Sequence, residues 1–386
     1  MKLAKRITKI KESETLKIGQ RIKQLQSHGK SVINFAVGEL DFETPEEIKQ
    51  ATKHALDQNK TRYAETSGLP ELKSTISKKL QRDNHIPCAE DNILLSNGSK
   101  QVLYSIFQVL CNPGDEVIIP TPYWVSFSEQ AKLAGAKPVF VQTKNHQLDV
   151  DKIKKAITKK TKIMIINTPN NPTGAVYNKE SLKAVAELAV QKKITILSDE
   201  AYELLTYEKP HISIASLSED IRGQTITVQS FSKIFSMTGF RLGYLCAEKE
   251  IVQAVNKLQS HISSNPCTFA QYGAIAAYML DKRVIADRVS VLRKRRDLAY
   301  KETTKLFDCI RPEGAFYLLP NISKTAKKLP KGTDFSSHLL DKAGVAVVPG
   351  EAFGAPNHIR ISYALSEEKI KEGFERLQAQ SQERRE

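Results

Sequence analysis

One lysine in the sequence has unusual neighbours. Lys233 lies in the segment TVQSFSKIFSMTGFRLGYLC, residues 227–246, among serines, phenylalanines and other uncharged residues. A surface lysine normally has charged or polar neighbours, so this setting predicts a half-buried amine. A buried lysine amine that has lost its proton is a nucleophile toward carbonyl groups and can form a Schiff base with them. The alternative is a lysine that lies by accident at the end of a strand.

Two further polar groups follow apolar, strand-like segments. In ITILSDEAYELL, Asp199 and Tyr202 come where the apolar run ends. An aspartate there is often only a helix cap; the alternative is an anion held against a cationic ring nitrogen, with the tyrosine hydroxyl as a second donor. In INTPNNPTGAVY, Asn171 offers a donor and an acceptor in a rigid turn, at the end of a strand where open α/β sheets bind ligands. Most Asn-Pro turns are only structural, and that alternative stays open.

Small and cationic residues form a predicted phosphate cup. A strand runs into the turn at residues 97–100, and an amphipathic helix follows at once. The free N–H groups and the positive dipole end of such a helix attract anions, although a plain N-cap explains the same pattern. A hydroxyl and a guanidinium on either side of Lys233 would complete the cup. The residues of the predicted cup are Gly98, Ser99, Lys100, Ser230 and Arg241.

A flat ring would fit beside these groups. Trp124 is the single tryptophan and follows the strand-like segment DEVIIP; it is either part of the core or a surface on which a ring stacks. The cofactor that combines a Schiff-base lysine with an aspartate at a ring nitrogen is pyridoxal 5'-phosphate (PLP). Together, the phosphate turn, the aromatic, the Asn turn, the Asp and Tyr pair and the Lys segment predict a PLP site.

Seven short apolar runs, each followed by a helical pattern, set the predicted fold. Strands that are apolar throughout and alternate with helices favour a mostly parallel sheet covered on both faces, an α/β fold. The predicted strands are 92–96, 115–120, 137–143, 162–168, 194–200, 225–230 and 243–248. The predicted helices include 99–111, 124–134, 150–157, 179–192 and 249–262. The polar residues above all come at strand ends, so we expect them to converge around one phosphate.

The two ends of the chain depart from this rhythm. A long basic helical pattern at 285–306 is followed by short strands, a helix near 334–343 and a closing helix near 366–382, which is typical of a smaller α+β unit. We predict three segments: an N-terminal arm with part of the small domain at 1–45, a large PLP-binding domain at 46–285, and a small C-terminal domain at 286–386.

Composition and charge limit the class of protein. The 386 residues are 40% hydrophobic and 26% charged, as in globular proteins, and 58 Lys and Arg against 43 Asp and Glu give a net charge of +15. The basic residues are spread along the chain, which is typical of a solvated surface rather than a polyanion site. Five scattered cysteines, no secretory signal and no run of the ~18 apolar residues that a membrane span needs predict a cytoplasmic protein with no nucleic-acid or membrane partner.

The sequence also resembles the class I (fold type I) pyridoxal-phosphate aminotransferases, in particular the aspartate and aspartate/prephenate aminotransferase subgroup. The resemblance runs from INFAVGELDFETP through NKTRYAETSGLPELK, PNNPTG, SDEAYE, SFSKIFSMTGFRLG and RPEGAFYLLP to HIRISYA. It implies a three-layer α/β/α large domain with a mostly parallel seven-stranded sheet, and a smaller α+β domain made from both chain ends. It further implies ping-pong transamination, through a pyridoxamine phosphate form, between aspartate or glutamate and a 2-oxo acid such as 2-oxoglutarate or oxaloacetate.

The resemblance implies a role for each residue of the PLP site. Lys233 matches the lysine that holds the cofactor and moves the substrate proton, and Asp199 matches the aspartate at the pyridinium nitrogen. Tyr202 and Asn171 match the donors to the phenolic oxygen of the ring, and Trp124 matches the stacking aromatic. The residues that match the phosphate binders are Gly98, Ser99, Lys100, Ser230 and Arg241.

Three more residues match family positions that bind the substrate or the cofactor of the neighbouring subunit. Arg360 in HIRISYA matches the arginine that clamps the substrate α-carboxylate, and Gly38 matches a glycine whose backbone lies against the substrate. Tyr63 in TRYAETSG matches a tyrosine that reaches the phosphate of the neighbouring subunit, which implies a homodimer with shared active sites. A surface salt bridge is the alternative for Arg360, but arginine suits bidentate carboxylate recognition better than lysine does.

The substrate is a separate question, because a dicarboxylate needs a second cation. Lys100 follows the phosphate turn and is a candidate, with a solvent-facing lysine as the alternative. Members of the subgroup with a lysine there use aspartate, glutamate and prephenate, and an N-terminal Lys and Thr, matched by Lys11 and Thr15, line their substrate pocket. This chain has Glu12 and Glu14 where the family has Pro and a small residue, and that departure bears on prephenate as a substrate.

Two alternative functions stay open. One is another PLP enzyme of the same fold, such as an aromatic- or alanine-type aminotransferase or a C–S β-lyase. The other is a basic, non-enzymatic protein that associates with nucleic acid, which the net charge of +15 motivates. No helix-turn-helix pattern accompanies that charge.

Overall fold

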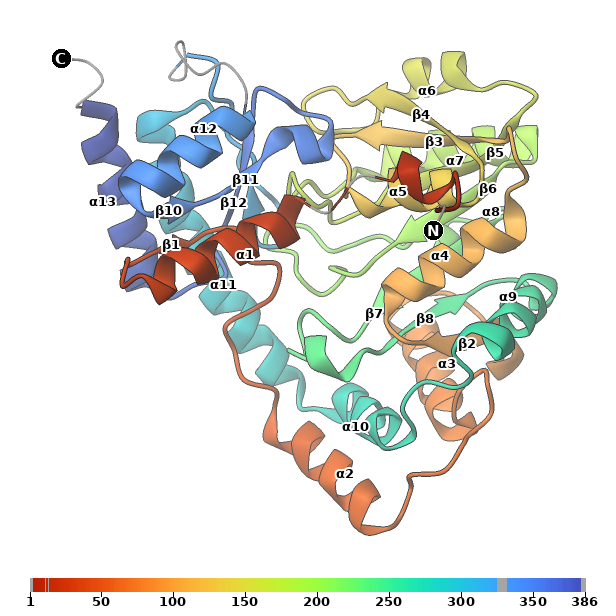
Figure 1. Ribbon diagram of the computed structural model, residues 1–386. Helices are drawn as coiled ribbons and strands as arrows, with labels where there is room; N and C mark the ends of the chain where they lie inside the picture. Colours follow the sequence, from red (N-terminus) through yellow and green to blue (C-terminus); the bar gives the residue numbers. More distant parts are fainter. Residues whose placement is uncertain (1–2, 11, 13, 325–331, 383–386) are drawn as a thin grey trace.

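The computed structural model describes residues 3–10, 12, 14–324 and 332–382. Figure 1 shows two parts: a large sheet with its helices, and a smaller part in which the first helix lies beside the last ones. The cofactor and substrate residues predicted from the sequence come from both parts, so the way the two parts meet decides the geometry of the site.

A seven-stranded sheet forms the centre of the larger part, with the strand order β2-β8-β7-β6-β5-β3-β4. Neighbouring strands are parallel except at β8, which is antiparallel to both β2 and β7. The strands are β2 Ile93–Ser96, β3 Glu116–Thr121, β4 Lys137–Gln142, β5 Thr161–Asn167, β6 Thr195–Asp199, β7 Thr225–Ser230 and β8 Gly243–Cys246. The prediction of a mostly parallel seven-stranded sheet is confirmed.

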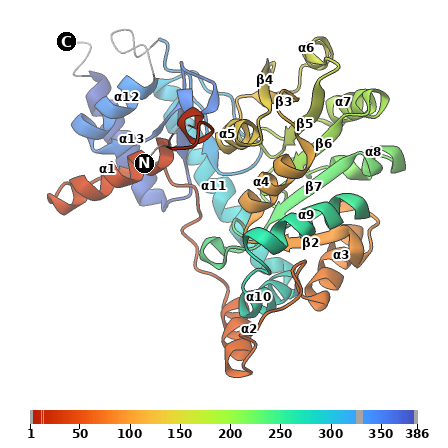
Figure 2. The ribbon, with the colours of Figure 1, turned by 45° about the vertical axis from the view of Figure 1, so that its right-hand side comes forward.

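Helices cover both faces of this sheet (Figure 2). Ile163 and Ile165 of β5 belong to one hydrophobic core and Met164 and Ile166 to the other, because successive side chains of a strand point to opposite faces. The first core is covered by α4 Ser99–Leu110, α5 Ser126–Leu133 and α9 Lys249–Ile262, and the second by α6 Val150–Ala156, α7 Lys179–Lys192 and α8 Glu219–Gly223. Two buried faces explain why most of the strands are apolar throughout. The edge strand β4 is an exception to that prediction, since Phe140 is 50% exposed.

Three helices pack below the β2 edge of the sheet. They are α2 Glu46–Asp57, α3 Pro70–Asn84 and α10 Thr268–Met279, and α10 packs on both α2 and α3. A 25-residue helix, α11 Lys282–Leu306, then leads to the smaller part. The helices named from the sequence do not include α2, α3, α8 or α10.

The smaller part joins the two ends of the chain. Strand β1 pairs parallel with β10, which brings Ile33 next to Val345 (Figure 1). Its elements are α1 Glu14–Ser27, β1 Ile33–Asn34, β9 Tyr317–Leu318, α12 Gly332–His338, the π-helical turn Leu339–Ala343, β10 Val345–Ala346, β11 Val348–Pro349, β12 Ile359–Ser362 and α13 Glu367–Gln382. Short 3-10 turns occur at Ile7–Lys9, Glu90–Asn92, Ile214–Ser216, Thr238–Phe240 and Gly350–Phe353. The segment boundaries after residues 45 and 285 stay a prediction, and α11 crosses the second of them.

The direction of the strands gathers the polar residues at one edge of the sheet. The parallel strands β5, β6 and β7 end there, and β8 begins there because it runs the opposite way. Gly243, the first residue of β8, pairs with both Ser96 and Ser230. Arg241, two residues earlier, therefore reaches the same edge as the turn that follows β2.

Two structural features are absent from the part of the chain that the structure describes. No helix in residues 3–10, 12, 14–324 and 332–382 is long and apolar enough to cross a membrane. In the same ranges, no group of three or more His, Cys, Asp or Glu side chains is arranged to hold a metal ion.

Candidate active site

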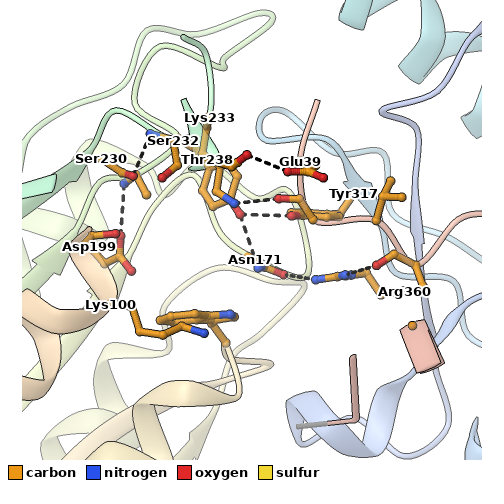
Figure 3. Close-up of a pocket in the computed structure, with 18 of the residues that line it drawn as sticks. Glu39, Lys100, Asn171, Asp199, Ser230, Ser232, Lys233, Thr238, Tyr317 and Arg360 are labelled. Atoms are coloured by element: carbon orange, nitrogen blue, oxygen red, sulfur yellow. Dashed lines mark hydrogen bonds between the residues drawn. The ribbon is translucent and has the colours of Figure 1, made fainter. Parts of the chain in front are cut away.

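A cavity of about 700 Å³ lies at this edge of the sheet, against the smaller part. In the view of Figure 3, Asp199 and Ser230 lie on one side of it and Tyr317 and Arg360 on the other. Its described lining has four cationic side chains and two carboxylates, an excess of positive charge that suits anionic ligands. The predicted site residues in this lining are Gly38, Ser99, Lys100, Trp124, Asn171, Asp199, Tyr202, Ser230, Lys233, Arg241 and Arg360.

Lys233 follows β7 and presents its amine to the cavity. The side chain is half-buried, as predicted, and Nζ donates a hydrogen bond of 2.7 Å to the carbonyl oxygen of Gly38. Burial, together with the positive charge of Arg360, lowers the pKa of the Lys233 amine to about 8, against the opposing effect of Asp199 and Glu39. The amine is thus readily deprotonated for a lysine, and a neutral lysine amine can act as a nucleophile or a base.

Asp199 ends β6 and is buried. Its Oδ1 accepts a hydrogen bond of 3.1 Å from the backbone N–H of Ala201. Burial raises the pKa of the Asp199 carboxyl to about 6, although the Ala201 hydrogen bond and the charge of Lys233 both act to lower it. A turn, not a helix, follows the strand, so the helix-cap alternative is wrong. The carboxyl lines the cavity instead.

A chain of hydrogen bonds crosses the cavity from the large part to the small one. Nη1 of Arg360 donates to Oδ1 of Asn171 at 3.0 Å, and Nδ2 of Asn171 lies 3.5 Å from the Tyr202 hydroxyl. The Tyr202 hydroxyl is also 3.1 Å from the hydroxyl of Tyr317. Burial and the neighbouring Tyr317 hydroxyl raise the pKa of Tyr202 well above its usual value, so the phenol stays protonated and remains a donor.

Arg360 is buried, at 3% exposure, in β12. Nη2 donates to the carbonyl oxygen of Ala36 at 3.1 Å, and the guanidinium lies between the rings of Tyr317 and Phe353, 4.3 and 5.1 Å from their centroids. Nε of Arg360 has no hydrogen-bond partner among the described residues. The surface salt bridge is therefore the wrong alternative, and the buried guanidinium keeps donor capacity for a ligand.

The turn before α4 is the predicted anion site, and its geometry can be compared with the plain N-cap alternative. Gly98 is the N-cap of α4, with φ of +82°, and no side chain caps this end of the helix, so the plain N-cap alternative is wrong. A Cβ atom on Gly98 would lie 2.5 Å from Nη2 of Arg241, and one on Gly243 would lie 2.3 Å from the backbone nitrogen of Ser99. The Arg241 guanidinium thus packs directly on the helix N-terminus, where an anion meets both.

Lys100 and Trp124 form one wall. Nζ of Lys100 lies 5.1 Å from the centroid of the Trp124 ring, and Figure 3 shows Lys100 at the cavity. Partial burial and the charge of Arg241 lower the pKa of the Lys100 amine. Trp124 lines the cavity and also packs on the first core of the sheet, so its place in the core is confirmed and its role as a stacking surface stays a prediction.

Three predicted residues are not among the described lining of the cavity, and only one of them, Tyr63, has a described side chain. Tyr63 follows α2 and is 91% exposed. Lys11 lies outside the described residues, and Thr15 belongs to α1, whose residues Leu16, Gly19 and Ile22 line the cavity. A role of Lys11 and Thr15 in substrate binding stays a prediction.

Several lining residues were missed by the sequence analysis. The most important is Tyr317, whose segment AFYLLP was noted but whose contact with Tyr202 depends on the pairing of β9 with β12. Thr238 and Glu39 also line the cavity, and the Thr238 hydroxyl donates to Oε2 of Glu39 at 2.7 Å. No spacing in the sequence links these residues, since 199 positions separate Thr238 from Glu39.

The chemistry of these donors fits PLP. The cradle at Gly98, which a Cβ atom would fill, suits a phosphate group next to the Arg241 guanidinium. The Trp124 ring, the Asp199 carboxyl and the Lys233 amine line the same cavity. PLP has an aromatic ring that can stack on the tryptophan, a basic nitrogen that suits the carboxyl and an aldehyde that suits the amine.

The chain is similar to known aminotransferases over nearly its whole length. The sequence model of the family described as aminotransferase class I and II matches residues 30–377. A probable aspartate/prephenate aminotransferase of Aquifex aeolicus is 44% identical over 383 residues, 97% of either chain, and the aspartate aminotransferase of Bacillus subtilis is 43% identical over 385 residues, 98% of either chain. The solved structure of the Thermus thermophilus aspartate aminotransferase with maleate, 38% identical, superimposes with a TM-score of 0.94 and covers 99% of this chain and 100% of that one. The chain therefore belongs to the class I and II aminotransferases, a family that uses pyridoxal phosphate, and it is an enzyme that carries out transamination.

Proposed function

We propose that the protein transfers the amino group of L-aspartate or L-glutamate to a 2-oxo acid, with PLP bound in the cavity. One observation carries the proposal: a single cavity of about 700 Å³ is lined by the lysine with a lowered pKa, the buried carboxyl and the partly unpaired arginine. These groups are the minimum that an amino-acid transaminase needs, because one moves a proton, one supports the cofactor ring and one orients the substrate.

The cofactor would be held by residues around the whole cavity. Lys233 would bind it covalently, Asp199 would pair with its ring nitrogen, Tyr202 and Asn171 would bond its ring oxygen, and Trp124 would cover its ring face. Its phosphate would be held by Gly98, Ser99, Lys100, Ser230 and Arg241. When bound, PLP supplies a conjugated cationic ring that takes up the electron pair left when the substrate Cα–H bond breaks.

Lys233 is the proposed proton carrier. A base works best when its pKa lies near the working pH, and the pKa of about 8 leaves a useful fraction of neutral Nζ at neutral pH. The hydrogen bond to Gly38 fixes the direction of the amine. Nζ would accept the proton from the substrate Cα and deliver it to the carbon on the other side of the amino nitrogen, so that both half-reactions of a ping-pong cycle use one group.

Arg360 is the proposed binding group for the substrate α-carboxylate. Asn171 and Ala36 hold two of its nitrogens and two aromatic rings hold its plane, which leaves it preorganised for a carboxylate. A fixed guanidinium orients the substrate, and orientation accounts for a large part of rate enhancement.

The second carboxylate of a dicarboxylic substrate would bind near Lys100. Its amine lies over the Trp124 ring, and a partly buried cation without a carboxylate beside it favours an anionic ligand. This supports aspartate, glutamate, oxaloacetate and 2-oxoglutarate as substrates. Prephenate is a further proposed acceptor, supported by relatives whose names pair aspartate with prephenate.

A homodimer with shared sites is also part of the proposal. Tyr63 is 91% exposed in this chain and would become buried against a second copy in the proposed dimer. Sedimentation should give twice the mass of the chain, and Tyr63→Phe should weaken PLP binding without changing that mass. A monomer that binds PLP as tightly as the native enzyme would contradict shared sites.

All five cysteines are free thiols, which supports a reducing compartment such as the cytoplasm.

Steady-state kinetics with a substrate panel tests the function directly. The panel pairs aspartate, glutamate, aromatic, alanine and branched-chain donors with 2-oxoglutarate, oxaloacetate and prephenate, and we expect the dicarboxylates to give the highest kcat/KM. L-Aspartate should also decrease the visible absorbance of the bound cofactor. Lys233→Ala should remove turnover, and a variant that still turned over would refute the proposed site. Release of pyruvate and thiol from cysteine conjugates would instead indicate a C–S β-lyase.

A further inference from the structure

A buried polar network lies directly behind Asp199, on the side of the sheet edge away from the cavity lining. Glu200, the next residue, is fully buried at 0% exposure. Its carboxylate accepts hydrogen bonds from Ser213 Oγ at 2.6 Å, Ser198 Oγ at 2.9 Å and Gln229 Nε2 at 3.3 Å, and His211 Nε2 lies at 3.0 Å. Four donors around one carboxylate are far more than chance packing provides, because buried charges are costly unless they are bonded.

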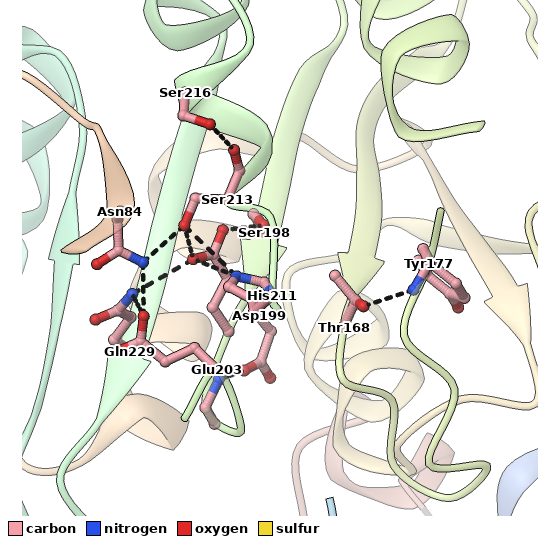
Figure 4. Close-up of polar contacts among 12 residues, drawn as sticks. Asn84, Thr168, Tyr177, Ser198, Asp199, Glu203, His211, Ser213, Ser216 and Gln229 are labelled. Carbon is pink, nitrogen blue, oxygen red and sulfur yellow. Dashed lines mark hydrogen bonds and ion pairs between the residues drawn. The ribbon is translucent and has the colours of Figure 1, made fainter. Parts of the chain in front are cut away.

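The network continues toward α3. Lys79 donates to Asn84 Oδ1 and Gln229 Oε1, both at 2.8 Å, and forms an ion pair with Glu203. Asn84 Nδ2 donates to Glu203 Oε2 at 2.6 Å and to Ser213 Oγ at 2.8 Å (Figure 4). The network therefore joins α3, β6, β7 and the segment before Ile214–Ser216 through side chains alone. The residues of this buried polar network are Lys79, Asn84, Ser198, Glu200, Glu203, His211, Ser213 and Gln229.

Glu200 keeps its negative charge in spite of its burial. Burial alone raises the pKa of a carboxyl, but the interactions with His211, and the hydrogen bonds from Ser213 and Ser198, outweigh it and lower the pKa of Glu200 overall. Within the network, two carboxylates face a single ammonium, that of Lys79. The imidazole of His211 is the only further group in the network that can carry positive charge.

The peptide between Asp199 and Glu200 is fixed on both sides. The Asp199 carbonyl oxygen accepts from Asn167 Nδ2 at 3.1 Å and from Thr168 N at 3.3 Å, and Glu200 N donates to the Val228 carbonyl oxygen at 2.8 Å. Successive side chains of a strand point in opposite directions, so the two carboxyls lie on opposite sides of this peptide. The charge of Glu200 acts on Asp199 from there and contributes to raising its pKa, while Lys233 acts in the opposite direction from the cavity.

We propose that Glu200, held by His211, Ser198 and Ser213, is a positioning residue for the cofactor ring, whose buried negative charge adds to that of Asp199 and stabilises the cationic form of the ring nitrogen. This inference rests on the proposed function, because it requires PLP beside Asp199. Electrostatic stabilisation of this kind needs fixed charges in a water-poor environment, and the Glu200 site provides both.

A purely structural role for the network predicts something different. If the hydrogen bonds only join α3, β6 and β7, loss of Glu200 and loss of Glu203 should have the same consequences. The two residues are buried or nearly buried carboxylates in one network, but only Glu200 acts electrostatically on Asp199. Glu203→Gln is therefore the matched control for Glu200→Gln.

The first measurement uses the cofactor-free protein. Carbon-13 NMR of labelled aspartate, with the Asp199 signal identified by Asp199→Asn, follows the titration of this carboxyl, which we expect to have a midpoint of about 6 in the native protein. Glu200→Gln keeps the shape of the side chain and removes the charge, so the midpoint should fall, by less than about one pH unit because burial is the main cause of the raised pKa. Glu203→Gln should leave it unchanged. A midpoint that stays the same in Glu200→Gln, or that falls equally in both variants, would overturn the inference.

The second measurement is the affinity for PLP and for its analogue with a carbon atom in place of the ring nitrogen, by calorimetry at pH 8, where Asp199 is ionised. Glu200→Gln should weaken PLP binding about tenfold and leave the affinity for the analogue unchanged, because only PLP has a nitrogen to protonate. Equal effects on both ligands would mean that Glu200 acts only on the fold. If the native protein did not bind PLP, the proposed function would fail instead, so the two failures are distinct.

A second variant covers the case in which Glu200→Gln does not fold. His211→Gln leaves Glu200 in place and removes the interaction that contributes most to keeping it ionised. The Asp199 midpoint should then change: it falls where Glu200 takes up a proton, and it rises where Glu200 stays ionised without the neighbouring imidazole. An unchanged midpoint in a folded His211→Gln protein would contradict the role of the buried charge.

Discussion

The substitution Arg360→Lys keeps the positive charge of the proposed substrate-binding cation and removes its planar shape. In the native protein, Nη1 and Nη2 of Arg360 are held by Asn171 and Ala36, and the guanidinium plane is sandwiched between two aromatic rings. A lysine has one nitrogen, which cannot satisfy Asn171 and also bind both oxygens of a carboxylate. This single change therefore separates two proposed roles of the Arg360 side chain. One is to bond Asn171 and Ala36, and the other is to bind the substrate carboxylate.

The size of the effect follows from the interactions that are lost. A hydrogen bond to a charged group contributes about 1.5–3 kcal/mol, and the contact of a planar cation with an aromatic face contributes about 0.5–1 kcal/mol. Loss of one of each amounts to about 2–4 kcal/mol of transition-state binding, which corresponds to a decrease of about 30- to 1,000-fold in kcat/KM. The decrease should be similar for amino acids and for 2-oxo acids, because both present the same carboxylate.

Steady-state kinetics in both directions measures this decrease. Arg311→Lys is the matched control, because Arg311 is exposed and pairs with Asp297 at 2.7 Å on the surface, and its kcat/KM should stay within about twofold of native. The visible spectrum of bound PLP should be the same in both variants, which shows that the cofactor site is intact. A loss of less than about threefold in Arg360→Lys would refute the assignment of the α-carboxylate to this arginine.

Three shorter predictions concern the amine, the anion site and the tyrosine pair. Lys233→Met should make the cofactor-free protein about 1–3 kcal/mol more stable at pH 7 in urea unfolding. The difference in stability between this variant and the native protein should shrink between pH 8 and 10.5, because there the unfolded native chain holds a proton on Lys233 that the folded one does not. A difference that stays constant with pH would contradict this. Gly98→Ala should weaken binding of PLP and of inorganic phosphate by about tenfold in calorimetry, because Cβ would displace Arg241, and unchanged affinities would argue against the phosphate cup. Tyr317→Phe should lower kcat about three- to tenfold with KM unchanged, because the Tyr202 hydroxyl loses its partner at 3.1 Å, and a native kcat would show that this contact is dispensable.

Much of the cavity could be predicted because its residues follow strands. A run such as ITILSDE identifies both a buried strand and the polar residue that ends it, and Asp199 indeed ends β6. Parallel strands end at one edge, so the sequence order of these segments was enough to predict that Asn171, Asp199 and Lys233 meet. The order of the apolar runs and the polar residues that end them were enough for this prediction, without knowledge of any contact between distant residues.

The residues that were missed depend on contacts between distant segments. The buried polar network pairs Lys79 with Glu203, 124 positions away, and nothing around either residue distinguishes it from a surface charge. Tyr317 reaches Tyr202 only because β9 pairs with β12 in the smaller part. The alternative interpretations of Trp124 could not be separated either, since one side chain lines the cavity and also packs on the core.

The anion site shows why local sequence could not decide between a cap and a ligand site. A glycine and a serine at the start of a helix fit both interpretations, and the residues near them are the same in either case. The decision comes from β8, whose antiparallel pairing sets Gly243 against Ser96 and brings the Arg241 guanidinium onto the N-terminus of α4. A parallel strand in that position would begin at the opposite edge of the sheet and take Arg241 away from the cavity. The position of the Arg241 guanidinium beside the proposed phosphate turn therefore depends on the direction of one strand, β8, and no short sequence motif encodes that direction.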